Sequence, residues 1–207
     1  MTITFYGEGC FKIQSGEIVV LTDPPEATSG LTPPRFKADV TLKTLSPAKN
    51  QKTSASQIIG AGEYNISGIN IFGFPLPEES NDKILKTIYI VEAEDIRLCF
   101  LGHLTGTLDP IIVEHLGEVN VLFMPAGGQP FIDQKTAVKL VKQIEPKIVI
   151  PSFFKIPGLK RKSDDIKVFL EEFNSKKEKS VTAQDKLTIK KKDLESFKSA
   201  QIIALNA

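Results

Sequence analysis

Residues 119–154 read VNVLFMPAGGQPFIDQKTAVKLVKQIEPKIVIPSFF and carry the clearest structural pattern in the chain. The segment 119–124 is a nearly uniform apolar run, as expected of a strand that is buried on both faces. The segment 133–144 places its apolar residues at helical spacing, and 147–150 is a second buried strand. This alternation of strand and helix predicts an α/β protein with helices packed outside its sheets.

Toward the N-terminus, short β-branched and aromatic runs are separated by Gly, Pro and Asp, which is typical of strands joined by turns. Strands are expected over 2–6, 10–14, 17–22, 40–45, 69–74, 88–92 and 96–101. A helix is expected over 109–116, with Asp109 as its N-cap and Pro110 in its first position. Toward the C-terminus, a helix over 164–173, capped by Ser163, precedes strands over 186–190 and 201–205.

Length and composition place bounds on the class of protein. The chain has 207 residues, of which 41% are hydrophobic. This length and composition predict one domain over 1–207, with residues 162–207 packing on the rest of it. The net charge is only +1, which argues against a nucleic-acid or membrane-surface partner. We expect no membrane span and no signal peptide, and therefore a cytoplasmic location. Cys10 and Cys99 lie in apolar runs and are expected to be buried free thiols.

Several sequence segments, in their order along the chain, resemble those of a single protein family. They are ITFYGEGCFKI at 3–13, VVLTDPP at 19–25, ADVTLKTLSPAKN at 38–50, GAGEYNISGINIFGF at 60–74, RLCFLGHLTGTL at 97–108 and the stretch 119–155. Together they resemble the small lactonase-like, Zn-dependent hydrolase branch of the metallo-β-lactamase-fold superfamily, over about residues 1–160. The resemblance implies an αββα sandwich of two mixed β-sheets flanked by helices.

The resemblance also implies where metal ligands would lie, and the chain departs from the family there. Leu45, Pro47, Lys49 and Asn50 stand in the places of His, His, Asp and His, Phe100 and His103 in those of a later His and the bridging Asp, Phe153 in that of the last His, and Glu8 where an early His is common. Leu, Phe and Pro donate no ligand, and a lysine repels a dication. Hydrolysis through bound zinc is therefore expected to be absent.

Three functions remain open at this point. The leading interpretation is a metal-free, non-catalytic protein with no cofactor, which binds or scaffolds an unknown small molecule or protein; oligomerisation is left open. The alternative is a metal-dependent hydrolase whose altered site uses Glu8, Asp23, Glu63 and His103, with zinc as the metal. A third is a metal-free acid–base enzyme that uses His103 and a carboxylate.

The remaining polar residues each allow two interpretations. His103 is a general base or metal ligand, or else a hydrogen-bonded loop histidine, whereas His115 is expected on the surface. Asp23 supports the pocket floor or caps the turn at Pro24. Glu63 is catalytic or is paired structurally.

Two expectations concern the vacated metal site. Lys49 is expected to replace the lost dication by pairing with one of the carboxylates, or else to be a solvated loop lysine. The apolar side chains at ligand positions are expected to fill the cavity or to line a small hydrophobic pocket. These are Leu45, Pro47, Phe100 and Phe153.

Overall fold

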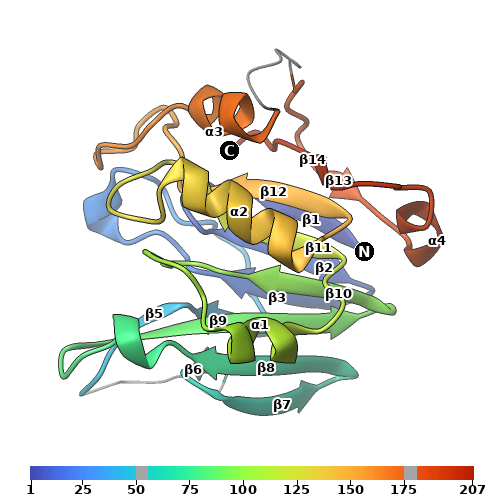
Figure 1. Ribbon diagram of the computed structural model, residues 1–207. Helices are drawn as coiled ribbons and strands as arrows, with labels where there is room; N and C mark the ends of the chain where they lie inside the picture. The colour runs from blue at the N-terminus through green and yellow to red at the C-terminus, as the bar shows by residue number, and fades with distance from the viewer. Residues whose placement is uncertain (50–55, 175–180) are drawn as a thin grey trace.

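The computed structural model describes residues 1–49, 56–174 and 181–207. Two β-sheets stack face to face, and helices cover the outer side of one of them (Figure 1). Two stacked mixed sheets with few helices confirm the predicted fold class.

The six-stranded sheet is built mainly from the N-terminal part of the chain. Its order is β13 (Leu187–Thr188), β1 (Thr2–Phe5), β2 (Phe11–Ser15), β3 (Ile18–Thr22), β4 (Val40–Lys43) and β6 (Gln57–Ile59). The pairs β1–β2 and β2–β3 are antiparallel, whereas β3–β4 and β4–β6 are parallel. The parallel part places the ends of β3 and β4 at the same edge of the sheet.

The eight-stranded sheet holds the segment with the clearest sequence pattern. Its order is β14 (Gln201–Ile202), β12 (Ile148–Ser152), β11 (Val121–Pro125), β10 (Ile96–Phe100), β9 (Ile84–Ala93), β8 (Ile69–Pro75) and β7 (Gly62–Ile66), and β5 (Leu45–Pro47) also pairs with β9. The neighbours from β10 to β14 are parallel, and those from β7 to β10 are antiparallel. Every residue of β11 and β12 is buried, as predicted.

The helices are α1 (Pro110–Leu116), α2 (Gln134–Ile144), α3 (Ile166–Phe173) and α4 (Lys191–Leu194), with two short 3₁₀ segments, η1 (Ala27–Ser29) and η2 (Pro77–Glu79). The three longer helices, α1, α2 and α3, begin at aspartate N-caps. Asp109 caps α1 as predicted, and Asp133 caps α2. The predicted cap of α3 is wrong. Asp165, which directly precedes the helix, accepts the N–H of Lys167, whereas the buried hydroxyl of Ser163 has no hydrogen-bond partner among the described residues.

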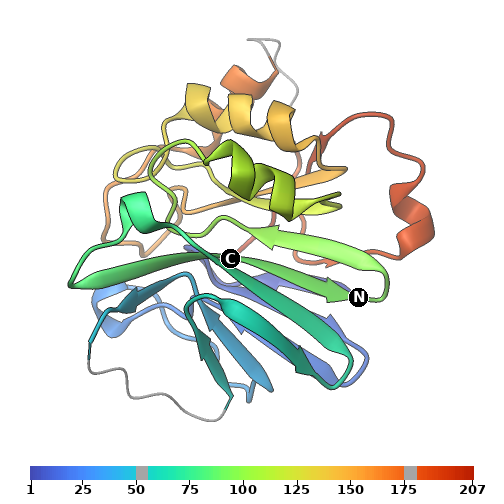
Figure 2. The same cartoon turned by 60° about the horizontal axis from the view of Figure 1, so that its bottom comes forward.

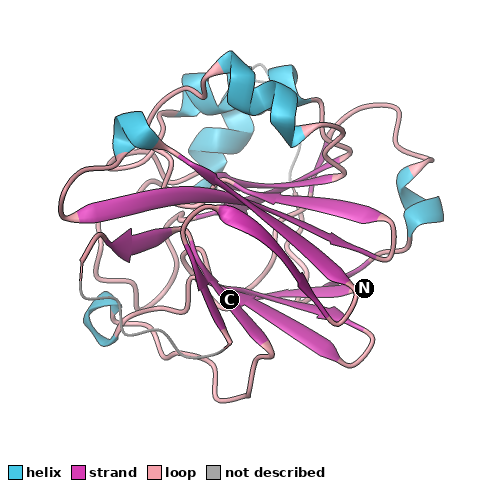
Figure 3. Cartoon of the chain, turned by 90° about the horizontal axis from the view of Figure 1, so that it is seen from below, coloured by secondary structure: helices cyan, strands magenta, loops and turns pink. Residues whose placement is uncertain are grey.

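Successive side chains of the central strands point to opposite faces of the sheet, so the hydrophobic core has two layers. In β9, Tyr89 and Val91 face the other sheet, while Ile88 and Ile90 face the helices. One apolar cluster fills the space between the sheets, and the second lies under α1, α2 and α3. Figures 2 and 3 show most of the helical segments gathered on one side of the stacked strands. Burial of both clusters is the main force that holds the layers together.

The single strand predicted over 40–45 is instead two strands in different sheets. At Thr44 the chain leaves β4 and enters β5. The Thr44 N–H donates to Asp23 Oδ1 at 2.8 Å, and its carbonyl accepts the Thr87 N–H at 2.9 Å. Thr44 therefore joins the two sheets at the edge where β3 and β4 end.

No helix within the described residues is long and apolar enough to cross a membrane. Cys10 and Cys99 are buried free thiols, as predicted. His115 is exposed in the last turn of α1, where its Nδ1 lies 2.6 Å from the carbonyl of Ile111.

Candidate functional site

A pocket of about 250 Å³ opens where strands from both sheets end. Asp23 follows β3 and Lys43 ends β4 in the first sheet, while His103 follows β10 and Phe153 follows β12 in the second. The lining is completed by Glu8 and Gly9 of the β1–β2 turn, Leu45 of β5, and Pro24, Pro25, Glu26, Thr28 and Ser29. Ligand sites of α/β proteins commonly lie at such carboxyl ends of strands.

A chain of hydrogen bonds crosses the floor of the pocket from one sheet to the other. Asp23 Oδ2 lies 2.6 Å from the Thr44 hydroxyl, and that hydroxyl lies 2.7 Å from Nδ1 of His103. The carboxylate and the imidazole themselves are 4.0 Å apart. Gly102 permits this contact, because its φ is +54° and a Cβ there would collide with the Thr44 side chain.

The protonation state of Asp23 decides the order of donors in this chain and, with it, the histidine tautomer. When Asp23 is ionised, both of its oxygens accept, one from the Thr44 N–H and one from the Thr44 hydroxyl. Because that hydroxyl has only one proton to donate, it must then accept from His103 Nδ1–H. The other ring nitrogen, Nε2, is left with a lone pair. Nε2 forms no hydrogen bond within the described residues, and it is not one of the buried unpaired atoms, so it is accessible from the pocket.

Burial shifts both titratable groups of the floor toward their neutral forms. Burial raises the pKa of the Asp23 carboxyl, against the lowering effects of His103, Thr44 and Lys43. Burial also lowers the pKa of His103, against the raising effect of Asp23, and Lys86 and Arg161 lower it further. His103 is thus held as a neutral imidazole near neutral pH.

Phe153 occupies the centre of the apolar wall. Its side chain is buried, and its ring centroid lies 4.8 Å from that of His103 and 4.5 Å from that of Phe131. A Cβ on Gly9 would come within 2.5 Å of the Phe153 ring, so the glycine lets the ring lie against the β1–β2 turn. This packing agrees with the expectation that the Phe153 side chain fills the cavity or lines a small hydrophobic pocket.

The cation that pairs with Glu8 is Arg161 and not Lys49. Arg161 Nη2 lies 3.0 Å from Glu8 Oε1 and 2.6 Å from the Phe153 carbonyl oxygen, and Nε lies 3.3 Å from Glu8 Oε2. The guanidinium also lies over the Phe131 ring, 4.8 Å from its centroid. Lys49 is exposed and pairs with no described carboxylate, which agrees with the expectation of a solvated loop lysine and not with that of a replacement cation.

Arg161 and Thr44 were missed by the sequence analysis. Arg161 is the only arginine in the lysine-rich run 155–162, and a fork of N–H groups suits a carboxylate and a carbonyl better than an ammonium does. Thr44 directly precedes the degenerate ligand stretch, where its hydroxyl gave no separate signal. Each residue could have been suspected only from its position beside that stretch or within that run.

The other predicted site residues are dispersed. Leu45 lines the pocket, whereas Pro47 is exposed on β5 and Phe100 lies in the core between the sheets, stacked on Phe123 with centroids 4.1 Å apart. The expectation that Pro47 and Phe100 line the cavity is therefore wrong, because strand pairing with β9 and core packing take them away from it. Asn50 lies outside the described residues.

Glu63 does not belong to the pocket. It is exposed on β7, where it pairs across the ladder with Phe72, and it is not among the residues that line the cavity. The four side chains of the alternative metal site, Glu8, Asp23, Glu63 and His103, are therefore not brought together.

The donor set does not fit a metal ion. Within the described residues, no three His, Cys, Asp or Glu side chains lie close enough to hold one. The undescribed stretch 50–55 contains none of these residue types. Of the lining carboxylates, Glu8 is bound to Arg161, Asp23 is bound to Thr44, and Glu26 is exposed. A zinc centre needs several free imidazole, thiolate or carboxylate donors at one point, and this pocket does not supply them.

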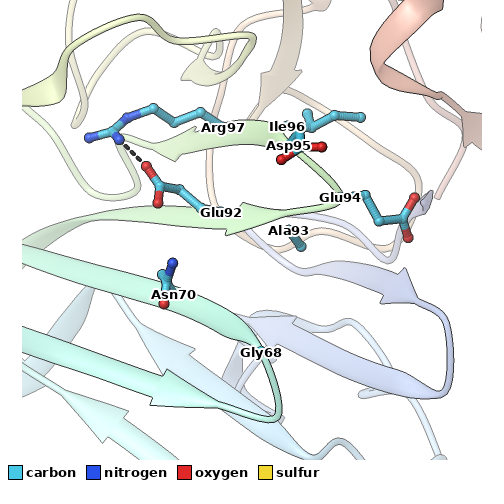
Figure 4. A pocket seen from close by; sticks show the side chains of 8 residues that line it. All are labelled: Gly68, Asn70, Glu92, Ala93, Glu94, Asp95, Ile96 and Arg97. Carbon is cyan, nitrogen blue, oxygen red and sulfur yellow. Dashed lines mark hydrogen bonds and ion pairs between the residues drawn. The ribbon is translucent and has the colours of Figure 1, made fainter.

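A second hollow, of about 370 Å³, lies at the β9–β10 hairpin and differs in character (Figure 4). Three of its four charged side chains are already paired within the protein. Arg97 pairs with Glu92, and Glu94 accepts from the Met1 ammonium at 2.6 Å and from Ser15 at 2.8 Å. We therefore place the candidate site at the carboxyl ends of the strands.

Comparison with known proteins agrees with this architecture. The family described as Beta-lactamase superfamily domain matches residues 2–152, and the chain belongs to this family. No curated protein matches the chain in sequence.

Three solved structures extend the comparison. A candidate Zn-dependent hydrolase of the metallo-beta-lactamase superfamily from Thermotoga maritima is 25% identical, with a TM-score of 0.78 over 99% of this chain and 97% of that one. The metallo hydrolase Igni18 from Ignicoccus hospitalis is 17% identical, with a TM-score of 0.63 over 84% and 90% of the two chains. A candidate metal-dependent hydrolase from Parabacteroides distasonis is also 17% identical, with a TM-score of 0.58 over 99% and 93%. At 17% identity the last two bear on the fold alone.

Proposed function

We propose that this chain is a metal-free, non-catalytic member of its family that binds a small molecule in the pocket at the carboxyl ends of the strands. The proposal rests on one observation, which is that the pocket has few side chains free to bind a metal ion. Phe153 and Leu45 line the pocket where the resemblance places imidazoles in the family, and the carboxylates of Glu8 and Asp23 are bound to Arg161 and Thr44. Without a bound metal, no water in the site is activated for hydrolysis.

The backbone of the pocket supports a retained binding role. Glu8, Asp23 and Phe153 all have left-handed conformations, with φ of +54°, +34° and +56°. Such conformations are costly for residues other than glycine and tend to gather at functional sites. Three of them around one cavity favour a site that is still used over a simple core.

The alternative function, a metal-dependent hydrolase, rests on the descriptions of the related structures. Its metal would need Glu63, which does not line the pocket, and Glu8, which Arg161 neutralises. The metal-free acid–base enzyme has in its favour the oriented, neutral His103. It has no second free acid or base among the described lining residues that contact this histidine.

Thermal unfolding with added metals tests the proposal. Zinc, manganese and iron(II) should leave the unfolding midpoint unchanged, because a ligand that binds only the folded state must raise it. In parallel, the protein should not hydrolyse ester, lactone or phosphodiester substrates above the rate of a heat-inactivated sample. A midpoint that rises with metal concentration, together with metal-dependent hydrolysis, would establish the alternative function.

A further inference from the structure

His103 lies on a loop whose shape depends on other segments of the chain. The loop, residues 101–109, joins β10 to α1. Its first part is held by the Nδ1 contact of His103 with Thr44 and by the Ile132 N–H, which donates to the Leu104 carbonyl at 3.0 Å. The contacts that fix the next residues of the loop therefore also bear on where the imidazole lies.

The side chain of Glu79, at the end of η2, fills a cage of backbone N–H groups and an ammonium at this loop. Its carboxylate accepts from the Thr105 N–H at 2.9 Å and from the Gly106 N–H at 2.8 Å, and the Lys86 ammonium donates to it at 2.9 Å. The glutamate and lysine side chains are only 13% and 10% exposed. These contacts are charge-assisted hydrogen bonds, which are stronger than hydrogen bonds between neutral groups.

Hydrogen bonds at the base of η2 fix where Glu79 points. The Leu76 N–H donates to the Lys86 carbonyl at 3.0 Å. The Ser80 hydroxyl donates to the Leu76 carbonyl at 2.7 Å and accepts from the Lys86 N–H at 3.0 Å. Although burial raises the pKa of Glu79, hydrogen bonds from Lys86 and Thr105 hold that pKa below its ordinary value. The carboxylate is therefore charged at neutral pH.

We propose that Glu79 is a latch that positions His103 in the pocket. The backbone N–H groups of Thr105 and Gly106 form, together with Lys86, a carboxylate-binding site that the chain's own glutamate occupies. Glu79 is not among the described residues that line the pocket, so it acts on a bound molecule only through His103 and is a positioning residue. Its effect on ligand binding rests on the proposed function, whereas its anchoring of His103 does not.

Glu79→Ala tests the carboxylate site, because the substitution removes the same heavy atoms that an acetate ion contains. Acetate should therefore bind this variant and raise its unfolding midpoint. Acetamide, which has the same shape without the charge, should bind at least about tenfold more weakly. Glu78→Ala removes the neighbouring exposed carboxylate of η2 and is the matched control. Like the unsubstituted protein, it should respond to acetate no more than to sodium chloride at the same ionic strength.

Nuclear magnetic resonance of the histidines shows whether the latch positions the imidazole, since His103 and His115 are the only two in the chain. In Glu79→Ala, the ring ¹⁵N signals of His103 should move toward those of a solvated imidazole, while those of His115 on α1 stay in place. Acetate should return the His103 signals to their positions in the unsubstituted protein. Glu79→Gln keeps an oxygen for the backbone N–H groups but loses the ion pair with Lys86, so it should show an intermediate shift.

The outcomes separate the latch from the proposed function. Unchanged His103 signals in Glu79→Ala and Glu79→Gln would show that the ion pair does not position the imidazole. Equal effects of acetate and acetamide would show that the cage is not a carboxylate site. If Glu79→Ala does not fold in plain buffer, its refolding yield in acetate should exceed that in acetamide, and equal yields would overturn the inference. Zinc that raises the unfolding midpoint of the unsubstituted protein would refute the proposed function and leave the latch intact.

Discussion

Phe153→Ala measures how firmly the apolar plug holds the old metal site closed. Phe153 is 1% exposed, so truncating its side chain to a methyl group removes a fully buried ring and leaves a cavity in its place. Truncation of a buried phenylalanine costs about 3–5 kcal/mol, which includes a term for the cavity left behind. Here the vacated space joins an existing pocket, so solvent can enter it. We therefore expect the lower end of the range, about 3 kcal/mol.

The backbone at this position supplies a second test of the same reasoning. Phe153 has φ +56°, a conformation that alanine adopts at a cost and glycine adopts freely. Phe153→Gly should therefore be no less stable than Phe153→Ala, although it has the smaller side chain. At an ordinary helical or strand position the glycine variant would be the weaker one by about 0.5–1 kcal/mol.

Urea unfolding, monitored by circular dichroism, measures the differences in the free energy of unfolding between these variants as shifts in the unfolding midpoint, provided that the dependence on urea concentration stays the same. Phe36→Ala is the matched control, because Phe36 is only half-buried and should lose about 1 kcal/mol or less. A loss below about 1 kcal/mol for Phe153→Ala would show that the ring is not a packed plug. A glycine variant clearly weaker than the alanine variant would refute the assigned backbone conformation.

Three further predictions concern the charges and thiols. Arg161→Met should cost about 2–3 kcal/mol in the free energy of unfolding, because it leaves a half-buried carboxylate unpaired, whereas Lys49→Met should change it by less than about 0.5 kcal/mol; equal effects in urea titrations would contradict this assignment. Burial lowers the pKa of His103 from its ordinary value of 6.5, so the unfolded chain binds more protons than the folded protein just below pH 6.5. The free energy of unfolding should therefore fall as the pH drops through that window. His103→Gln should remove this pH dependence, and His115→Gln should keep it. Burial raises the pKa of Cys10 to about 12, so native protein should resist iodoacetamide at about pH 8 and react fully in denaturant; rapid alkylation of the native protein would show an accessible thiolate.

The parts of the fold that the sequence predicted best are those governed by local patterns. The buried strands β11 and β12 and the amphipathic helix α2 follow from apolar periodicity, and Asp133 marks the start of α2. The switch from β4 to β5 was not predicted, because 40–45 has the composition of one continuous strand. Hydrogen bonds to Asp23 and Thr87, which are distant in sequence, decide where that strand ends.

The candidate site was predictable only where it coincides with the family positions. Glu8, Asp23, Leu45, His103 and Phe153 do converge on one pocket. The compensating cation did not follow from those positions, because Arg161 reaches Glu8 from a loop more than a hundred residues further along the chain. Glu63 was singled out because its β-rich surroundings show no local need for a carboxylate, and its exposed position on the edge strand β7 accounts for the charge.

The central claim is that the pocket of this family member has lost its metal, and elemental analysis of the purified protein tests it most directly. Inductively coupled plasma mass spectrometry after a mild chelator wash should find zinc, iron and manganese far below one equivalent per chain. The prediction follows from a lining in which Phe153 and Leu45 donate no ligand and Glu8 and Asp23 are already bound. A stoichiometric metal that survives the wash would contradict the account.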